Sequence, residues 1–167
     1  LDTRFTPADP VIWTGDFNVA REPIDVYDPE GLLGGLCYNE HEHAALDYAI
    51  QWGLVDIFRK HHPGEANQFS FWDYRVPNAF KRRMGWRLDH IFATNPLAEK
   101  STDCWIDPEP RLLEKPSDCA PLLRRFLTEV VPSEKPRPAE RTLSASDPAS
   151  RIVKASFPVS SLERVRR

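Results

Sequence analysis

Cysteine, methionine and long apolar segments are scarce in this sequence of 167 residues. Its three cysteines, Cys37, Cys104 and Cys119, are an odd number without a CxxC pair, which argues against a disulfide framework and indicates a reducing, cytoplasmic setting. No apolar run approaches the ~18 residues of a membrane span, and no signal peptide opens the chain, so we expect no membrane partner. Because the only methionine is Met84 and the chain begins at Leu1, we expect a piece of a longer protein.

Neither sign of charge dominates the chain, which has 22 basic and 25 acidic residues and a net charge of -3. This balance excludes a histone-like cationic coat, so nucleic acid must be contacted through a local basic patch. Residues 1–131 hold 14 basic and 21 acidic side chains, whereas residues 132–167 hold 8 basic and 4 acidic ones, with five prolines. The second segment has too little apolar surface to offset its ordering entropy. We therefore expect a disordered basic tail, either an electrostatic tether to DNA or an extension without a role.

Short apolar runs and turn residues predict several strands and one helix within residues 1–131. Asn39 is expected to cap a helix from Glu40 to Trp52, which Gly53 ends. Proline and glycine predict a loop over residues 21–38, and strands are expected over 11–13, 69–74, 87–92, 102–106 and 121–126. This mixture points to an α/β or α+β fold.

Three aspartates lie where working carboxylates are often found. Asp16 and Asn18 follow the first strand, share a face if the chain stays extended, and suit a hard cation or a phosphoryl oxygen; the alternative is a plain turn. Asp89 stands among apolar residues, so it is either a structural salt-bridge partner or a functional carboxylate. Asp118 lies in a loop framed by prolines that restrict its conformation, and alone this loop is a turn.

A basic and aromatic segment is the best local candidate for a nucleic-acid contact. Residues 75–87 contain five basic and no acidic side chains, and aromatic residues surround them. Positive charge mixed with aromatic faces binds phosphates and stacks on bases or sugars, although we expect more than half of these aromatics in the core. The pairs His41/His43 and His61/His62 lack the spacing of a zinc helix, and we expect them to be solvent-exposed.

Five short motifs occur in an order that resembles one family. They are Trp13-Thr14-Gly15-Asp16-Phe17-Asn18, Trp52-Gly53-Leu54-Val55-Asp56, Phe69-Ser70-Phe71-Trp72-Asp73-Tyr74-Arg75, Gly85-Trp86-Arg87-Leu88-Asp89-His90 and Lys115-Pro116-Ser117-Asp118. Over about residues 10–127 the chain resembles the C-terminal half of bacterial exonuclease III, in the endonuclease/exonuclease/phosphatase superfamily. The resemblance implies a four-layered α/β sandwich, two sheets face to face with helices outside, of which residues 1–131 are the C-terminal half.

The resemblance also implies an activity and roles for four residues. The family hydrolyses DNA phosphodiesters with Mg²⁺ or Mn²⁺, as a 3′-5′ exonuclease on duplex DNA and an abasic-site endonuclease in base excision repair. By motif match, Asp16 would orient or deprotonate the attacking water, and Asn18 would hydrogen-bond the phosphate. Asp118 would help to hold the metal, together with Asp16 and Asn18. Asp89 would support the histidine that follows the Asp118 position in the family.

A substrate surface is implied by the same resemblance. Three residues match positions that line the abasic-sugar pocket and three more lie close by: Phe71, Trp86 and Leu88, then Trp72, Tyr74 and Arg75.

The chain departs from the family in two ways. Cys119 stands at the position of the family histidine, and a thiol cannot replace an imidazolium. The family's N-terminal half, with its metal-binding glutamate and catalytic tyrosine, is missing, so we expect that half as a partner and little activity of this chain alone. The alternatives are an inactive remnant or DNA-binding module and, less favoured, a phosphatase of the superfamily acting on phospholipid or inositol phosphate headgroups.

Overall fold

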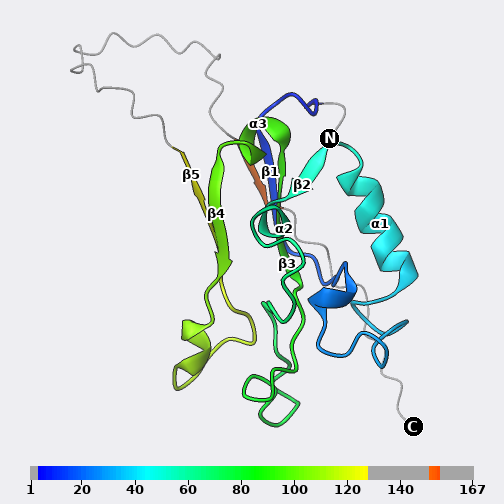
Figure 1. The fold of residues 1–167 in the computed structure, drawn as a ribbon, viewed down its shortest axis with the longest axis vertical. Helices are drawn as coiled ribbons and strands as arrows, with labels where there is room; N and C mark the ends of the chain where they lie inside the picture. The colour runs from blue at the N-terminus through cyan, green and yellow to red at the C-terminus, as the bar shows by residue number, and fades with distance from the viewer. Residues whose placement is uncertain (1–3, 128–150, 155–167) are drawn as a thin grey trace, which may run out of the picture.

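The computed structural model describes residues 4–127 and the backbone of residues 151–154. Helices and strands alternate along this part of the chain (Figure 1). In chain order they are β1 (Val11–Asp16), the 3-10 helix η1 (Pro23–Asp25), α1 (Glu40–Ile50), β2 (Leu54–Asp56), α2 (Ile57–His61), β3 (Asp89–Thr94), α3 (Asn95–Ala98), β4 (Ser101–Ile106), the 3-10 helix η2 (Glu109–Leu112), β5 (Leu122–Phe126) and β6 (Arg151–Lys154).

The strands form two sheets, one of four strands in the order β2-β3-β1-β6 and one formed by β4 and β5. Strand β1 pairs antiparallel with β3, in a register that sets Asp16 opposite Asp89. On its other edge β1 pairs in parallel with β6. The second sheet is antiparallel. The ends of β1 and β3 that carry the two aspartates therefore meet at one edge of the larger sheet.

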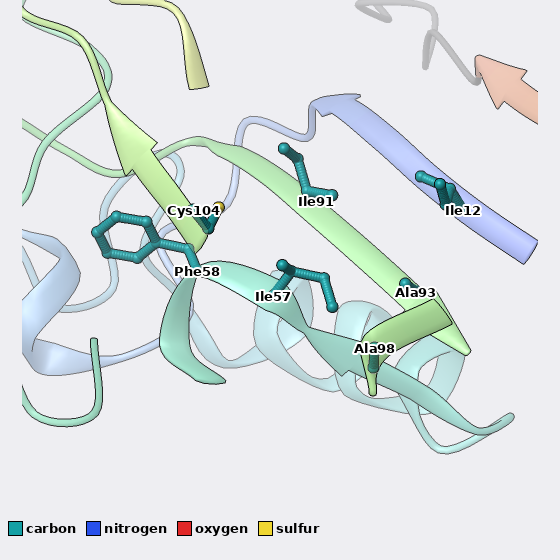
Figure 2. Packing of buried hydrophobic residues seen from close by; sticks show 7 residues of the cluster. All are labelled: Ile12, Ile57, Phe58, Ile91, Ala93, Ala98 and Cys104. Atoms are coloured by element: carbon teal, nitrogen blue, oxygen red, sulfur yellow. The ribbon is translucent and has the colours of Figure 1, made fainter. Parts of the chain in front are cut away.

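The core lies on both faces of the four-stranded sheet, between α1 and the β4–β5 pair, which stand on opposite sides of the central strands (Figure 1). On one face, α1 packs through Leu46 against Phe17 and Phe92. On the other face, residues of β1, α2, β3, α3 and β4 gather, as Figure 2 shows: Ile12, Ile57, Phe58, Ile91, Ala93, Ala98 and Cys104. Burying each larger apolar side chain contributes about 1.5–3 kcal/mol. The expected sandwich of two packed sheets with a helix outside is thus confirmed.

Most of the expected elements are confirmed, with shifted ends. The helix begins at Glu40 as expected, because the Asn39 side chain accepts a hydrogen bond from the Glu42 N–H at 3.1 Å. The chain leaves it through a turn that Gly53 completes at φ +115°, a conformation that glycine adopts without strain. The strands expected over 11–13, 102–106 and 121–126 correspond to β1, β4 and β5. The strand expected over 87–92 is β3, which starts two residues later.

The prediction of a strand over residues 69–74 is wrong. Only Phe71 makes isolated bridges there, to Trp86 and to Cys119. The backbone divides its hydrogen bonds between two partners, because the N–H groups of Ser70 and Phe71 both donate to the Trp86 carbonyl and the Trp72 N–H donates to the Asp118 carbonyl. A segment that divides its bonds in this way links two loops and does not extend one ladder.

The basic tail expected over residues 132–167 falls largely outside the described residues. The exception is residues 151–154, whose backbone forms β6 at the edge of the larger sheet, where a disordered segment was expected. Within the described part of the chain, no helix is long and apolar enough to cross a membrane.

Candidate active site

Asp16 ends β1, and its side chain organises the turn that follows. The Asp16 carboxylate accepts a hydrogen bond from the Asn18 N–H at 2.9 Å, and both residues are exposed. Asn18 has φ +53°, in the left-handed region that asparagine tolerates better than most residues. The expectation that Asp16 and Asn18 share a face of one extended strand is therefore wrong, because the strand stops at Asp16. The turn nevertheless holds a carboxylate and an amide close together in open solvent.

Asp89 faces Asp16 from the start of β3, and its environment disfavours its charge. Its N–H donates to the Ser70 hydroxyl at 3.0 Å, while its Oδ2 is buried and has no hydrogen-bond partner among the described residues. The pKa of Asp89 is raised to about 6, mainly by burial and also by the charges of Asp16 and Asp118, while the hydrogen bond with Ser70 lowers it. No ion pair of the described residues includes Asp89. The salt-bridge alternative for Asp89 therefore has no support, and the three carboxylates act on one another.

Asp118 and Cys119 reach this edge of the sheet from the loop before β5. The Asp118 carbonyl accepts a hydrogen bond from the Trp72 N–H at 2.9 Å, and the Ala120 N–H donates to the Ser70 carbonyl at 2.7 Å. Burial, with the added effect of the charges of Asp89, Asp118 and Asp16, raises the pKa of the Cys119 thiol to about 12, and only Arg111 among the named groups opposes this. The thiol is consequently neutral at physiological pH and offers only a weak donor.

An aromatic pair lies beside the carboxylates. The rings of Phe71 and Trp86 have centroids 5.8 Å apart at an interplanar angle of 59°, and both side chains are half-buried. Tyr27 meets the other side of Trp86 at 5.1 Å, edge to face. Leu88 is buried in the cluster against which the two rings pack. An apolar wall of this kind accepts a sugar or a base without a hydrogen bond.

The remaining residues expected to bind substrate are divided between surface and core. Tyr74 and Arg75 are exposed, and Arg75 forms a forked pair with Asp73 at 2.8–3.1 Å. Trp72 is only 6% exposed and packs against Phe69 and Phe80. The position of Trp72 therefore does not support the expected contact with substrate, because its side chain is buried among neighbouring rings.

A buried ionic network lies next to the site, and the sequence did not predict it. Arg87, which we had assigned to the basic patch, is fully buried and donates to Asp25 at 2.7 Å and to Asp56 at 2.9 Å. Its third contact is His90 Nδ1 at 3.0 Å. Because a guanidinium only donates, His90 Nδ1 accepts, and its Nε2–H donates to the Val19 carbonyl at 2.7 Å. The network thus ties β3 to the turn that carries Asn18.

The pKa values of Asp25 and Asp56 are lowered by their pairing with the arginine of this network. Burial alone would raise the pKa of Asp25 and Asp56, but the charges and hydrogen bonds of Arg87 and its neighbours outweigh burial and lower both. Charged residues next to apolar runs were the available signal in the sequence, since Asp56 follows Leu54 and Val55. A buried charge demands a partner, but the sequence does not name it.

Of the four histidines expected in solvent, His41 is exposed as expected, whereas the other three, His43, His61 and His62, are half-buried and hydrogen-bonded. His43 Nε2 lies 2.7 Å from the Ala20 carbonyl, and the ring of His62 stacks on Phe58 at 4.6 Å. His61 Nε2 lies 2.8 Å from the Ser101 hydroxyl. Within residues 4–127, no group of three or more histidine, cysteine, aspartate or glutamate side chains is arranged to hold a metal ion. Asp16 and Asp118 thus form at most part of a metal site.

The two packed sheets thus place the carboxylates at the end of β1 beside the aromatic pair. The comparison with known proteins identifies the family. Residues 2–118 match the Endonuclease/Exonuclease/phosphatase family, and the chain belongs to it.

Relatives of the chain include enzymes that act on DNA. Exodeoxyribonuclease III of Haemophilus influenzae is 33% identical over 132 residues, 75% of this chain and 49% of that enzyme. The structure of an AP endonuclease from Archaeoglobus fulgidus has a TM-score of 0.72 at 45% identity, over 75% of this chain and 49% of its own. The 3′ phosphatase NExo from Neisseria, bound to a product DNA hairpin, has a TM-score of 0.70 at 33% identity, over 76% and 48%. The chain spans about half the length of the relatives that it matches.

Proposed function

We propose that this chain is the C-terminal half of an exodeoxyribonuclease III-like phosphodiesterase, a 3′-5′ exonuclease and abasic-site endonuclease that acts on duplex DNA in base excision repair. The observation that carries the proposal is the convergence of Asp16, Asp89 and Asp118, distant in sequence, at one edge of the sheet. A cytoplasmic location, expected from the unpaired cysteines, belongs to the same proposal.

The site residues have distinct roles in this proposal. Asp16 is exposed at the end of β1, so it orients the attacking water or accepts its proton. Asn18, held beside it by the turn, donates its side-chain amide to a phosphoryl oxygen. Asp89 stays partly protonated near neutral pH, because burial and its acidic neighbours raise its pKa to about 6. Cys119 takes the position of the family histidine without supplying its charge.

A divalent cation, Mg²⁺ or Mn²⁺, fits part of this arrangement. Asp16, Asn18 and Asp118 would hold it, and the unpartnered Oδ2 of Asp89 reflects a cluster of negative charge without a cation among the described residues. Mg²⁺ is typically bound by one or two carboxylates together with water and phosphate oxygens, so an incomplete set of protein ligands suits it. The cation supplies acidity to bound water and positive charge for the phosphoryl group.

Substrate contact is proposed for the aromatic wall and the residues near it. Phe71, Trp86 and Leu88 form the apolar side of a pocket for an abasic sugar, in which the buried Leu88 packs behind the half-buried rings as part of the same cluster. Tyr74 and Arg75 contact the strand from exposed positions. This wall favours DNA over the phospholipid or inositol phosphate headgroups of the phosphatase alternative.

The N-terminal half of the fold is the partner that this function needs. The β5 strand and the residue after it expose Leu123 at 39% and Leu127 at 65%, apolar surface that a further part of the domain would cover. The alternative, an inactive remnant or DNA-binding module, is favoured by one observation, the raised pKa of Cys119, which leaves no charged donor at the histidine position.

The test is cleavage of a duplex with one abasic site in Mg²⁺. The 167-residue chain is assayed alone and with the N-terminal half of the Archaeoglobus fulgidus AP endonuclease, which is 45% identical over the matched part. We expect little cleavage by the chain alone and cleavage by the mixture, abolished by Asp16→Asn. Asp47→Asn is the matched control, because it removes the same charge from α1, where Asp47 pairs with Arg21.

Three outcomes would contradict parts of the proposal. Equal cleavage by the Asp16→Asn and Asp47→Asn mixtures would refute the role of the carboxylate cluster. Strong cleavage by the chain alone would refute the need for the N-terminal half. No cleavage by any mixture, with duplex binding retained, would establish the remnant or binding module instead.

A further inference from the structure

Arg111, in the 3-10 helix η2, lies over two aromatic rings. Its guanidinium carbon lies 5.8 Å from the ring centre of Trp72 and 5.7 Å from that of Phe80. Its backbone N–H donates to the Pro108 carbonyl at 3.0 Å, which fixes η2. A guanidinium held over aromatic rings loses little freedom when it binds an anion.

The donors of Arg111 lack an acceptor. Its Nε is buried without a hydrogen-bond partner, and no carboxylate of the described residues forms an ion pair with it. The nearby Asp73 is already engaged by Arg75, at 2.8 and 2.9 Å. A buried donor without a partner costs free energy unless an acceptor comes from outside the chain.

A cavity of about 380 Å³ opens at Arg111, and its wall supplies further donors. The polar side chains that line it with Arg111 are Lys81, Asn78, Tyr74 and Asp73, and the Asp73 carboxylate is paired with Arg75. An ammonium, an amide and a guanidinium around one space are the groups that bind a phosphate. The volume lies at the lower end of the ~300–1,000 Å³ of ligand sites, which suits one phosphate with part of its sugar.

The cavity adjoins the active site through Trp72. This residue stacks on Arg111 and also donates its backbone N–H to Asp118. An anion on Arg111 is thus a near neighbour of the carboxylate cluster without being part of it.

We propose that the cavity lined by Arg111, Lys81 and Asn78 is a subsite for a backbone phosphate of the DNA strand, separate from the phosphate that is cleaved. The inference rests on the proposed function, because it takes DNA as the ligand. It assigns to Arg111 a binding role that the motifs at Asp16, Asp89 and Asp118 do not contain.

The salt dependence of duplex binding tests the subsite. Fluorescence anisotropy of a labelled duplex, with chelator present to prevent cleavage, gives the slope of log affinity against log salt for each variant of the full chain. Each phosphate contact contributes about 0.9 to that slope. We expect Arg111→Gln to lower the slope by about 0.9 and to weaken binding at least about tenfold.

Two further variants separate binding from folding and from bulk charge. Arg125→Gln removes the same charge from another arginine that lies over a tryptophan, Trp105 at 5.6 Å, but outside the cavity, so its slope should match the parent. Arg111→Lys keeps a point charge and should restore most of the slope. Equal slopes for Arg111→Gln and Arg125→Gln would overturn the subsite, and so would failure of Arg111→Lys to restore the slope.

A titration with inorganic phosphate, in which the NMR signal of the Arg111 Nε–H is followed, distinguishes DNA from free phosphate as the ligand. Saturable movement of this signal, absent from the signal of Arg125, supports the subsite. Saturation combined with an unchanged duplex slope would refute DNA as the ligand and assign the cavity to free phosphate. Cleavage is scored separately in the mixture with the N-terminal half, so failure of the proposed function is distinguishable from failure of the subsite.

Discussion

Replacing Arg87 with methionine should lower the free energy of unfolding more than the same substitution of an exposed arginine does. Arg87 is fully buried and bonds to Asp25, Asp56 and His90. Methionine has a similar length and fills most of the space, so the main effect is the loss of the charge. Asp25 keeps its ion pair with Arg59, whereas Asp56 loses its only arginine side-chain partner among the described residues.

Removing one partner of a buried ion pair typically costs about 3–5 kcal/mol, a large part of the ~5–15 kcal/mol that keeps a domain folded. The cost depends on pH. Arg87 and its neighbours lower the pKa of Asp56 and Asp25 against the effect of burial. A carboxyl with a lowered folded-state pKa stabilises above its ordinary value of 3.8 and loses that contribution as the pH falls through the folded-state value. The deficit of Arg87→Met should therefore be largest near neutral pH and shrink below about pH 4.

Urea unfolding of the full chain, followed by tryptophan fluorescence at several pH values, measures this deficit. Arg75→Met is the matched control, because Arg75 pairs with Asp73 but its side chain is 76% exposed, and such pairs contribute about 0–1 kcal/mol. Equal destabilisation by the two substitutions, or a deficit of Arg87→Met that does not change with pH, would refute the reasoning.

Three further predictions concern the site and the tail. Burial raises the pKa of Asp89 from 3.8 to about 6, so ionisation of Asp89 destabilises the folded state as the pH rises through this interval. In the same unfolding assay, Asp89→Asn should therefore stabilise the chain by up to about 3 kcal/mol above pH 6 and should not stabilise it below pH 4. Cys119→His should raise cleavage by the mixture with the N-terminal half by about 10²–10³, and an unchanged rate would show that the thiol is not the cause of low activity. Truncation after residue 131 should weaken duplex binding mainly at low salt, and a salt slope equal to that of the full chain would leave the tail without a binding role.

The elements with strong local signals were predictable from the sequence. Asn39 before an amphipathic stretch predicted the start of α1, and the apolar run before Gly15 predicted β1. Residues 69–74 alternate as a strand does, but the partners that divide their hydrogen bonds, Trp86 and Asp118, are distant in sequence. Local pattern cannot report such competition, because it depends on which distant backbone groups reach the segment.

The site was predictable as a set of residues but not as a geometry. Motif order singled out Asp16, Asp89 and Asp118, and the structure brings their charges together. The same motif suggested that Trp72 meets substrate, whereas the packing of Phe69 and Phe80 around it makes it core. Arg87 was assigned to a cationic surface because its partners lie 31 and 62 residues away. Burial, which decides between these alternatives, is a property of tertiary packing.

The pKa of the Asp89 carboxyl, measured by carbon-13 NMR in the full chain, tests most directly whether the three carboxylates form one site. The structure predicts a value of about 6, raised mainly by burial, that becomes lower when either Asp16 or Asp118 is replaced by asparagine but stays above 3.8. A value that stays the same in both variants would mean that the carboxylates do not converge, and the active site described above would be contradicted.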